Sequence, residues 1–211
     1  MQDLAMGQKM FEGLAGRATA KVMARMNLDS EREAIEILSP SPGDRVVALG
    51  IGAGVGVDLL AARLSGAAHS GDREGKVVQV VGVDPSAAML AEASRRNRRW
   101  IDVGSVELVE ATAALLDLEN GAFDGAIAVN SIQLWEPLDV SLREVSRVLR
   151  SGARLVSLTH DWAIERSTGR DVDGWSERIC MLSEAAGFTA PRVWRGRAED
   201  GRSVAFAATR A

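Results

Sequence analysis

Alternating glycines and one carboxylate are the residues of this sequence whose types and spacing could bind a ligand. Glycines occupy every second position from Gly50 to Gly56, directly after the apolar segment 45–49. Glycine lets the backbone take positive φ and approach a ligand without a Cβ clash. A helix that follows such a turn points free N–H groups and its positive dipole end at the loop, which favours an anion. The pattern predicts an anion-binding turn between a strand and a helix.

The spacing of these glycines excludes two common nucleotide-binding patterns. The dinucleotide pattern G-x-G-x-x-G needs a glycine at its sixth position, which is Val55 when counted from Gly50 and Val57 when counted from Gly52. No Gly-Lys-Ser/Thr follows, as a phosphate-binding loop requires. The spacing G-x-G-x-G fits a carboxylate better than a pyrophosphate. The alternative is a tight strand-to-helix connection that binds nothing.

Asp84 supplies a second chemical group, because it follows the next apolar segment, 77–83. In a parallel sheet, an acid at the end of the second strand lies next to the loop after the first. Its carboxylate can accept two hydrogen bonds from a ribose diol. The alternative role is to cap the helix that begins near Pro85, and the two roles are compatible.

The rest of the sequence alternates between strand and helix patterns, which indicates a parallel sheet with helices on both faces. Ser30 and Glu33 predict a capping box that opens a helix ending before Pro40. Later helices are expected from Pro137 to Leu149 and from an Asp173 cap to Gly187. Strands are predicted at 45–49, 77–83, 106–109, 125–130 and 153–159, with a closing hairpin at 192–194 and 203–208. We expect an α/β fold with a doubly wound, seven-stranded sheet whose last strand is antiparallel.

Length and charge limit the classes of protein that remain. A chain of 211 residues supports one hydrophobic core, so a single domain is expected, with a helical lid at 1–40 and a ligand-binding core at 41–211. A net charge of −4 disfavours nucleic acid as a partner. No apolar run is long enough to span a membrane. Cys180 alone forms neither an internal disulfide nor a metal site, so a cytoplasmic protein without a metal is expected, as a monomer or a homodimer.

These motifs resemble the class I S-adenosylmethionine-dependent methyltransferases, and more narrowly the small bacterial members that act on small molecules. The resemblance covers nearly the whole chain, including GLAGRATAKVMARMN at 13–27, which is similar to the N-terminal helical extension of those members. The segments that carry it most strongly are VVALGIGAGVG at 46–56, VVGVDPSAAML at 80–90, VELVEATAALLDLENGAFDGAIAVNSIQLW at 106–135 and LREVSRVLRSGARLV at 142–156. It implies a Rossmann-like methyltransferase fold and S-adenosyl-L-methionine as the cofactor.

Position by position, the resemblance implies a set of cofactor contacts and a substrate pocket. The cofactor contacts are Gly50, Gly52 and Gly54 at the methionine part, Asp84 at the ribose, Pro85, Met89, Thr112 and Ala113 at the adenine, and the Asn130 carbonyl at the amino group. The substrate pocket would comprise Ser131, Trp135, Met10 and Phe11. The family usually has acids at the positions of Ala48 and Thr112. A threonine hydroxyl still accepts a hydrogen bond, whereas losing the charge-assisted bond at Ala48 costs about 1.5–3 kcal/mol.

His160 is the candidate catalytic residue. It follows the predicted fifth strand, its imidazole suits a general base near neutral pH, and Asp161 beside it could tune that role. The alternative is a loop histidine satisfied by backbone or solvent. The leading hypothesis is methyl transfer to an oxygen, nitrogen or carbon of a small, partly apolar molecule, with secondary metabolism as one setting. The alternatives are a methyltransferase-fold enzyme that performs a cyclisation, rearrangement or isomerisation, and a protein that binds without catalysis.

Overall fold

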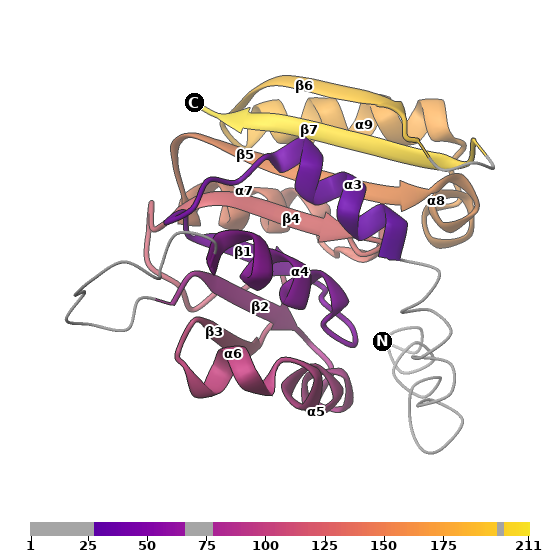
Figure 1. Ribbon diagram of the computed structural model, residues 1–211. Coiled ribbons are helices and arrows are strands. Elements are labelled where there is room, and N and C mark those ends of the chain that lie inside the picture. Colours follow the sequence, from indigo (N-terminus) through magenta and orange to yellow (C-terminus); the bar gives the residue numbers. More distant parts are fainter. Residues whose placement is uncertain (1–27, 66–77, 198–200) are drawn as a thin grey trace.

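One seven-stranded sheet organises the part of the chain that the computed structural model describes, which is residues 28–65, 78–197 and 201–211 (Figure 1). The strand order is β3-β2-β1-β4-β5-β7-β6. The strands are β1 (Val46–Leu49), β2 (Val80–Asp84), β3 (Val106–Glu110), β4 (Phe123–Val129), β5 (Leu149–His160), β6 (Phe188–Arg195) and β7 (Ser203–Arg210). β7 runs antiparallel to both of its neighbours, and the remaining pairs are parallel. The predicted seven-stranded sheet with an antiparallel last strand is confirmed.

The direction in which the chain adds strands reverses at β1. This strand pairs with β2 on one side and with β4 on the other, both in parallel. Open α/β sheets bind their ligands in the crevice outside the carboxyl ends of the strands, at such a reversal. The loops that follow β1, β2 and β4 therefore meet at the edge where a ligand is expected.

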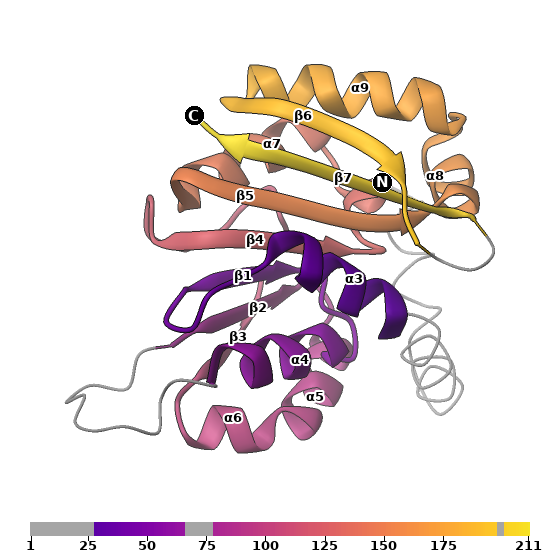
Figure 2. The ribbon, with the colours of Figure 1, turned by 45° about the horizontal axis from the view of Figure 1, so that its top comes forward.

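Helices cover both faces of the sheet (Figure 2). They are α3 (Leu28–Leu38), α4 (Val55–Leu64), α5 (Ala87–Arg96), α6 (Arg98–Asp102), the 3-10 turn η2 (Ile132–Leu134), α7 (Leu138–Val148), α8 (Asp161–Thr168) and α9 (Val172–Ala185). Successive side chains of a strand point to opposite faces. In β1, Val46 and Ala48 belong to the core under α3 and α4, whereas Val47 and Leu49 belong to the core under α7 and α9.

The predicted capping box at Ser30 and Glu33 is wrong. Helix α3 already includes Leu28, so Ser30 is not its first residue. Glu33 is buried, and both of its carboxylate oxygens accept from the backbone N–H of Arg197, at 2.9 and 3.0 Å. The Glu33 carboxylate therefore binds the chain after β6, and not the Ser30 backbone as a capping box would require.

Helix α3 is the described part of the predicted N-terminal lid, and it packs as a layer of the core. Ala34, Ile35 and Leu38 are buried against the sheet and α4. The rest of the lid, with Met10 and Phe11, lies outside the described residues. Among the described residues, no helix is both long and apolar enough to cross a membrane.

Two other helix starts illustrate local capping. α7 begins directly after Pro137, as predicted. α9 is capped by Asp171, whose carboxylate accepts from the Gly174 N–H at 2.8 Å, and the predicted cap Asp173 lies inside the helix. The capping chemistry was therefore predicted correctly at α9, but the residue was two positions off.

Candidate functional site

The glycine turn and Asp84 lie against each other at the carboxyl edge of the sheet. The backbone N–H of Gly52 donates to one Asp84 carboxylate oxygen at 2.8 Å, and the N–H of Ser86 donates to the other at 2.9 Å. Asp84 ends β2, and Gly50 directly follows β1. Two neighbouring strands therefore bring together the two groups that the sequence singled out, although their ligand-binding roles stay predictions.

Asp84 is only 7% exposed, and its surroundings set its charge and its remaining bonding capacity. Burial raises the pKa of its carboxyl group, and the hydrogen bonds from Ser86 and Gly52 only partly oppose that rise. A carboxylate has about four lone-pair positions, so about two remain after these bonds. The cap of α5 is Ser86, whose hydroxyl accepts from the Met89 N–H. Asp84 thus retains the capacity to accept from a diol.

Two glycines of the turn have different surroundings. Gly50 has φ +69° and Gly52 has φ +51°, in the left-handed region that favours glycine. A Cβ on Gly50 would overlap the side chain of Ser131. A Cβ on Gly52 would have no atom of the described residues within 4 Å. Open space therefore lies beside Gly52, next to the Asp84 carboxylate.

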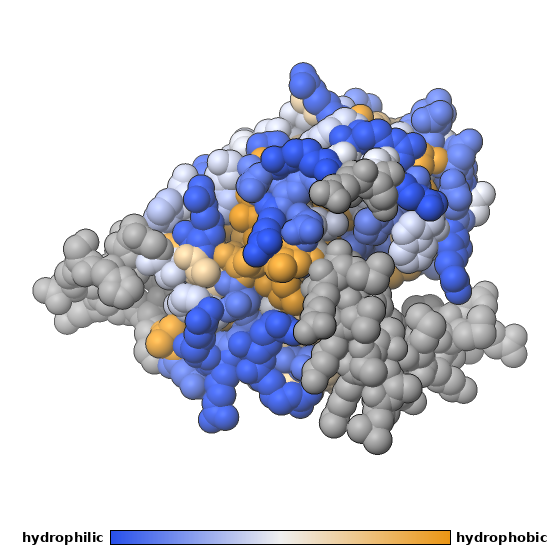
Figure 3. Space-filling view, turned by 45° about the vertical axis from the view of Figure 1, so that its right-hand side comes forward, coloured by the Kyte–Doolittle hydropathy of each residue, from blue (hydrophilic) through white to orange (hydrophobic). Residues whose placement is uncertain are grey.

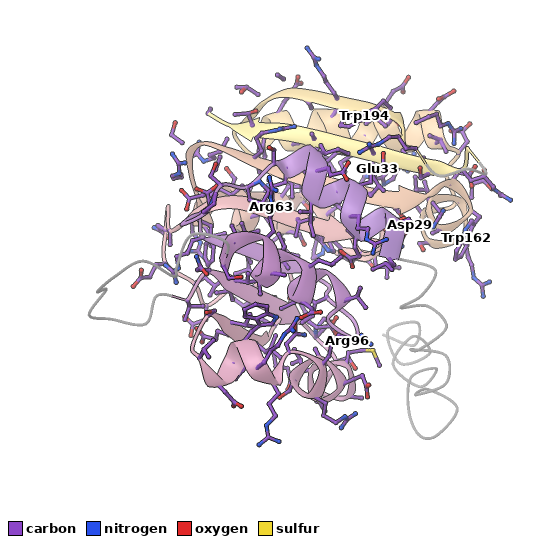
Figure 4. All side chains as sticks on the ribbon, in the orientation of Figure 1. Asp29, Glu33, Arg63, Arg96, Trp162 and Trp194 are labelled. Atoms are coloured by element: carbon purple, nitrogen blue, oxygen red, sulfur yellow. The ribbon has the colours of Figure 1, made fainter. Side chains whose placement is uncertain are left out.

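Residues at the end of α5 form hydrogen bonds with the glycine turn. Asn97 is fully buried, and its side-chain amide donates to the carbonyls of Gly54 at 3.0 Å and Ala93 at 2.9 Å. Arg96, labelled in Figure 4, donates from Nε to the Ala53 carbonyl at 2.9 Å. The sequence analysis missed both residues, because no local pattern links them to a turn more than forty positions earlier.

Asn97→Ala is expected to lower the free energy of unfolding by about 2–3 kcal/mol, because two hydrogen bonds are lost and two buried carbonyls lose a partner. Urea denaturation measures this change. Arg98→Ala is the control, since Arg98 is exposed and makes only a loose ion pair with Asp102 at 3.7 Å. A loss for Asn97→Ala as small as that of the control would show that the turn does not depend on this amide.

The loop after β4 is fixed by its own hydrogen bonds. Asn130 has φ +52°, and its carbonyl, the predicted contact of the cofactor's amino group, accepts from Gln133 Nε2 at 3.0 Å. Ser131 is buried, and its hydroxyl donates to the Leu49 carbonyl at 2.7 Å. Trp135 packs against the core under α7. This geometry favours a structural role for Ser131, whereas the contacts of Asn130 and Trp135 with ligands stay predictions.

The predicted adenine contacts lie after β2 and β3. Pro85 and Thr112 are exposed, and Met89 and Ala113 are partly buried. The sequence analysis missed the apolar side chains at the same edge. Three large ones are exposed after three different strands: Leu115 after β3, Leu134 after β4 and Trp162 after β5. Figure 3 shows a separate apolar patch, bordered by hydrophilic side chains, on the side of the molecule that carries α3 and α4.

His160 ends β5 at the carboxyl edge. Its ring stacks on that of Trp162, with centroids 6.1 Å apart and an interplanar angle of 17°. Its Nδ1 is buried, and no described residue forms a hydrogen bond with it. This nitrogen is therefore a candidate to bind a ligand.

Asp161 does not orient His160. Its carboxylate accepts from Arg202 Nε at 3.1 Å, and the second oxygen lies 3.5 Å from Arg195 Nη1. Burial acts to raise the pKa of Asp161, but the hydrogen bonds from Arg202 and the Trp162 N–H outweigh it and hold the pKa below its ordinary value. Asp161 therefore stays ionised and bound to arginines.

A doubly wound sheet with a glycine turn after β1 and an acid at the end of β2 defines the class of open α/β folds that bind their ligands at the strand reversal. A family model described as a methyltransferase domain matches residues 48–157, just over half of the chain. The chain belongs to this family.

Individual proteins are similar to this chain in sequence or in structure. An O-methyltransferase from Pyrenophora dematioidea is 29% identical over 133 residues, which are 62% of this chain and 45% of that relative. The match thus spans less than half of the relative's length. A SAM-dependent methyltransferase structure from Aquifex aeolicus has a TM-score of 0.68 and 18% identity, covering 92% of this chain and 98% of that one. The structure of the [4+2]-cyclase SpnF has a TM-score of 0.65 and 18% identity, covering 87% and 81%.

Proposed function

We propose that this chain transfers a methyl group from S-adenosyl-L-methionine to a small, partly apolar molecule. The observation that carries the proposal is the hydrogen bond between the Gly52 N–H and Asp84. It sets a buried carboxylate with unused lone pairs beside open space, at the reversal of strand order where this class of sheet binds ligands. These residues fit the adenosyl part of the cofactor.

The protein's contribution to such a reaction is to hold the reactants. When bound, the cofactor supplies a sulfonium methyl group that is displaced in line by the acceptor. Asp84 would bind the ribose hydroxyls, and the N–H groups at the start of α4 would face the carboxylate of the amino-acid end. Fixing the acceptor, the methyl group and the sulfur in line is worth up to about 7–11 kcal/mol.

The acceptor would lie over the apolar side chains at the carboxyl edge. Leu115, Leu134 and Trp162 expose large apolar surfaces there, which suits a partly apolar molecule and leaves the acceptor atom open. The acidic net charge supports a partner other than nucleic acid. We further propose that the chain works in the cytoplasm, as a monomer or a homodimer.

His160→Gln is expected to leave the affinity for S-adenosylhomocysteine within about twofold of wild type and to lower turnover by about 10²- to 10⁴-fold for a hydroxyl acceptor. The reason is that the imidazole would take the acceptor's proton from the end of β5. The measurement is S-adenosylhomocysteine release, compared with calorimetric affinity. Unchanged turnover would show that His160 is a structural loop residue and not a general base.

Calorimetric titration of the wild-type chain with S-adenosylmethionine and S-adenosylhomocysteine tests the function directly. We expect saturable binding of both, followed by S-adenosylhomocysteine release with an acceptor from a panel of small phenols, hydroquinones and amines. No heat at high protein concentration would contradict the proposal. Because a [4+2]-cyclase shares the fold, conversion of a substrate without S-adenosylhomocysteine release would also contradict it.

A further inference from the structure

A small cleft lies between α3, α4 and the sheet, directly behind the glycine turn. Its lining residues are Glu31, Ala48, Leu49, Gly50, Ile51, Gly56, Val57, Ile127 and Val129. Glu31 is the one ionisable residue in that lining. The cleft is partly open to solvent and has room for about one water-sized group. It therefore suits a small group at the end of a ligand.

The position of Glu31 on α3 explains why a carboxylate reaches the cleft. The buried apolar residues of α3 are Ala34, Ile35 and Leu38. Residues three or four positions apart share a face of a helix, so Glu31 continues the face of Ala34 and Ile35 toward the start of α3. Asp29 and Glu33, labelled in Figure 4, are placed differently: Asp29 is exposed, and Glu33 binds the Arg197 backbone. Glu31 thus places a carboxylate where the pattern predicts an apolar residue.

The missing Cβ of Gly56 makes room for this carboxylate. A Cβ at Gly56 would overlap the Glu31 carboxyl group, which therefore lies against the first turn of α4. No described residue forms a hydrogen bond or an ion pair with it. Part of the Glu31 side chain is exposed, but burial of its carboxyl group raises the pKa to about 8.

Charged groups on the neighbouring elements do not account for this raised pKa, since burial is its one cause. The titratable groups on α3 itself, on α4, β4 and β5, and on the chain after β6 are Asp29, Arg32, Glu33, Glu36, Asp58, Arg63, Asp124, Arg150, Arg154, His160 and Arg197. Several of these bind elsewhere: Asp58 accepts from Arg99 and Trp100, and Arg154 donates to the Ile37 carbonyl. A ligand cation would therefore be the partner that the Glu31 carboxylate lacks.

Ala48 belongs both to the cleft and to the positions where the cofactor's amino-acid end is expected. It lines the cleft, and its side chain points to the α3–α4 face of the sheet. Resting on the proposed function, we propose that Glu31 binds the α-ammonium group of the cofactor's amino-acid end, supplying from α3 the carboxylate that β1 lacks at Ala48. The ligand's own carboxylate would then face the N–H groups at the start of α4.

Binding would change the protonation of Glu31. With its pKa near 8, the free carboxyl group is mostly protonated at pH 7. An ammonium group favours the ionised form, so binding at pH 7 releases a proton. Calorimetry of the wild-type chain in buffers of different ionisation enthalpy measures this release. The measurement needs no variant, so it does not depend on whether a variant folds.

The main test compares two ligands on three proteins. The ligands are S-adenosylhomocysteine and its analogue with hydrogen in place of the α-amino group, and the proteins are wild type, Glu31→Gln and Asp29→Asn. Glu31→Gln should weaken S-adenosylhomocysteine binding about 10- to 150-fold and abolish the proton release, because one charge-assisted hydrogen bond is lost. It should leave the affinity for the analogue unchanged. Asp29→Asn, which removes an exposed acid from the same helix, should behave as wild type with both ligands.

The outcomes separate this inference from the proposed function. If the wild type binds neither ligand, the proposed function fails. If the wild type binds S-adenosylhomocysteine and Glu31→Gln loses affinity for both ligands equally, or for neither, Glu31 does not contact the ammonium group. A proton release on binding at pH 7 that persists in Glu31→Gln would also overturn the inference.

Glu31→Gln is also expected to change how stability depends on pH. Between the ordinary value of 4.5 and about 8, the native chain holds a proton at Glu31 that the unfolded chain has lost, so wild-type stability falls as pH rises through that window. Glutamine cannot ionise, so the variant should gain Tm relative to wild type at pH 8.5 compared with pH 4.5. Thermal unfolding of the ligand-free proteins measures this difference, and parallel Tm profiles would show that the carboxyl group is not buried.

Discussion

Asp84→Asn is expected to weaken S-adenosylhomocysteine binding by about 150-fold or more, the largest loss of affinity expected for any of these substitutions. Two charge-assisted hydrogen bonds from the ribose hydroxyls are at stake, each worth about 1.5–3 kcal/mol. Asparagine has one acceptor oxygen and no charge. It cannot satisfy both the Gly52 N–H and a diol, because its amide nitrogen is itself a donor. Calorimetric titration measures the change.

A ligand control separates ribose binding from support of the turn. Asp84 also accepts from Gly52 and Ser86, so the variant disturbs the turn even without a ligand. The 2′-deoxy analogue of S-adenosylhomocysteine should bind the wild type more weakly than the parent ligand does. Asp84→Asn should lose most of that preference. If the variant discriminates between the two ligands as strongly as the wild type, Asp84 only positions Gly52.

Local sequence patterns were sufficient for the parts of the fold and site that depend on neighbouring residues. The alternating glycines mark the turn after β1, and apolar runs mark the strands, because burial and backbone freedom are encoded in a few consecutive residues. The order of the elements then places Asp84 beside Gly52, since adjacent parallel strands end at one edge.

The residues that sequence analysis missed or misassigned act across large separations in the chain. Asn97 and Arg96 hold carbonyls of the glycine turn more than forty positions away. Glu33 matched a capping box, but the Arg197 N–H takes its carboxylate. No local pattern singles out Glu31, and only the bare backbone of Gly56 shows that its carboxyl group is directed inward. These contacts depend on tertiary packing, which overrides the local pattern.

Ala48 shows how such a contact changes an interpretation. From the sequence, the absence of an acidic residue at position 48 suggested weak cofactor binding or altered chemistry. In the structure, Glu31 of α3 lines the same cleft as Ala48. A carboxylate can thus reach one place from a strand or from the helix that covers it. The absence of an acid in β1 alone is therefore weak support for chemistry other than methyl transfer.

Gly50→Ala and Gly52→Ala are expected to have different main effects, although both glycines have positive φ. The first should mainly lower stability, and the second should mainly lower ligand affinity. Alanine in the left-handed region costs about 1–2 kcal/mol at either position. At position 50 the new methyl group would also overlap Ser131, which is buried and bonded to the Leu49 carbonyl. We expect Gly50→Ala to lose about 2–5 kcal/mol of unfolding free energy, because clashes in a packed core add about 1–3 kcal/mol to the backbone cost.

At position 52 the new methyl group meets no described residue but enters the space assigned to the ligand. Gly52→Ala should therefore lose only the backbone cost in stability, yet bind S-adenosylhomocysteine about tenfold or more weakly, since overlap with the ligand adds about 1.4 kcal/mol or more. Gly121→Ala is the matched control, because Gly121 has φ +63°, is exposed, and precedes β4 at the opposite edge of the sheet.

Comparing the three alanine variants by urea denaturation and calorimetry separates steric cost from ligand contact. Gly121→Ala gives the cost of the backbone conformation alone, so any excess loss of stability at Gly50 measures the clash with Ser131. Any loss of affinity at Gly52 beyond that of Gly121→Ala measures the ligand's approach to the turn. If Gly52→Ala bound S-adenosylhomocysteine as tightly as Gly121→Ala, the ligand would not cross the turn at Gly52, and Asp84 would face empty solvent instead of a ribose.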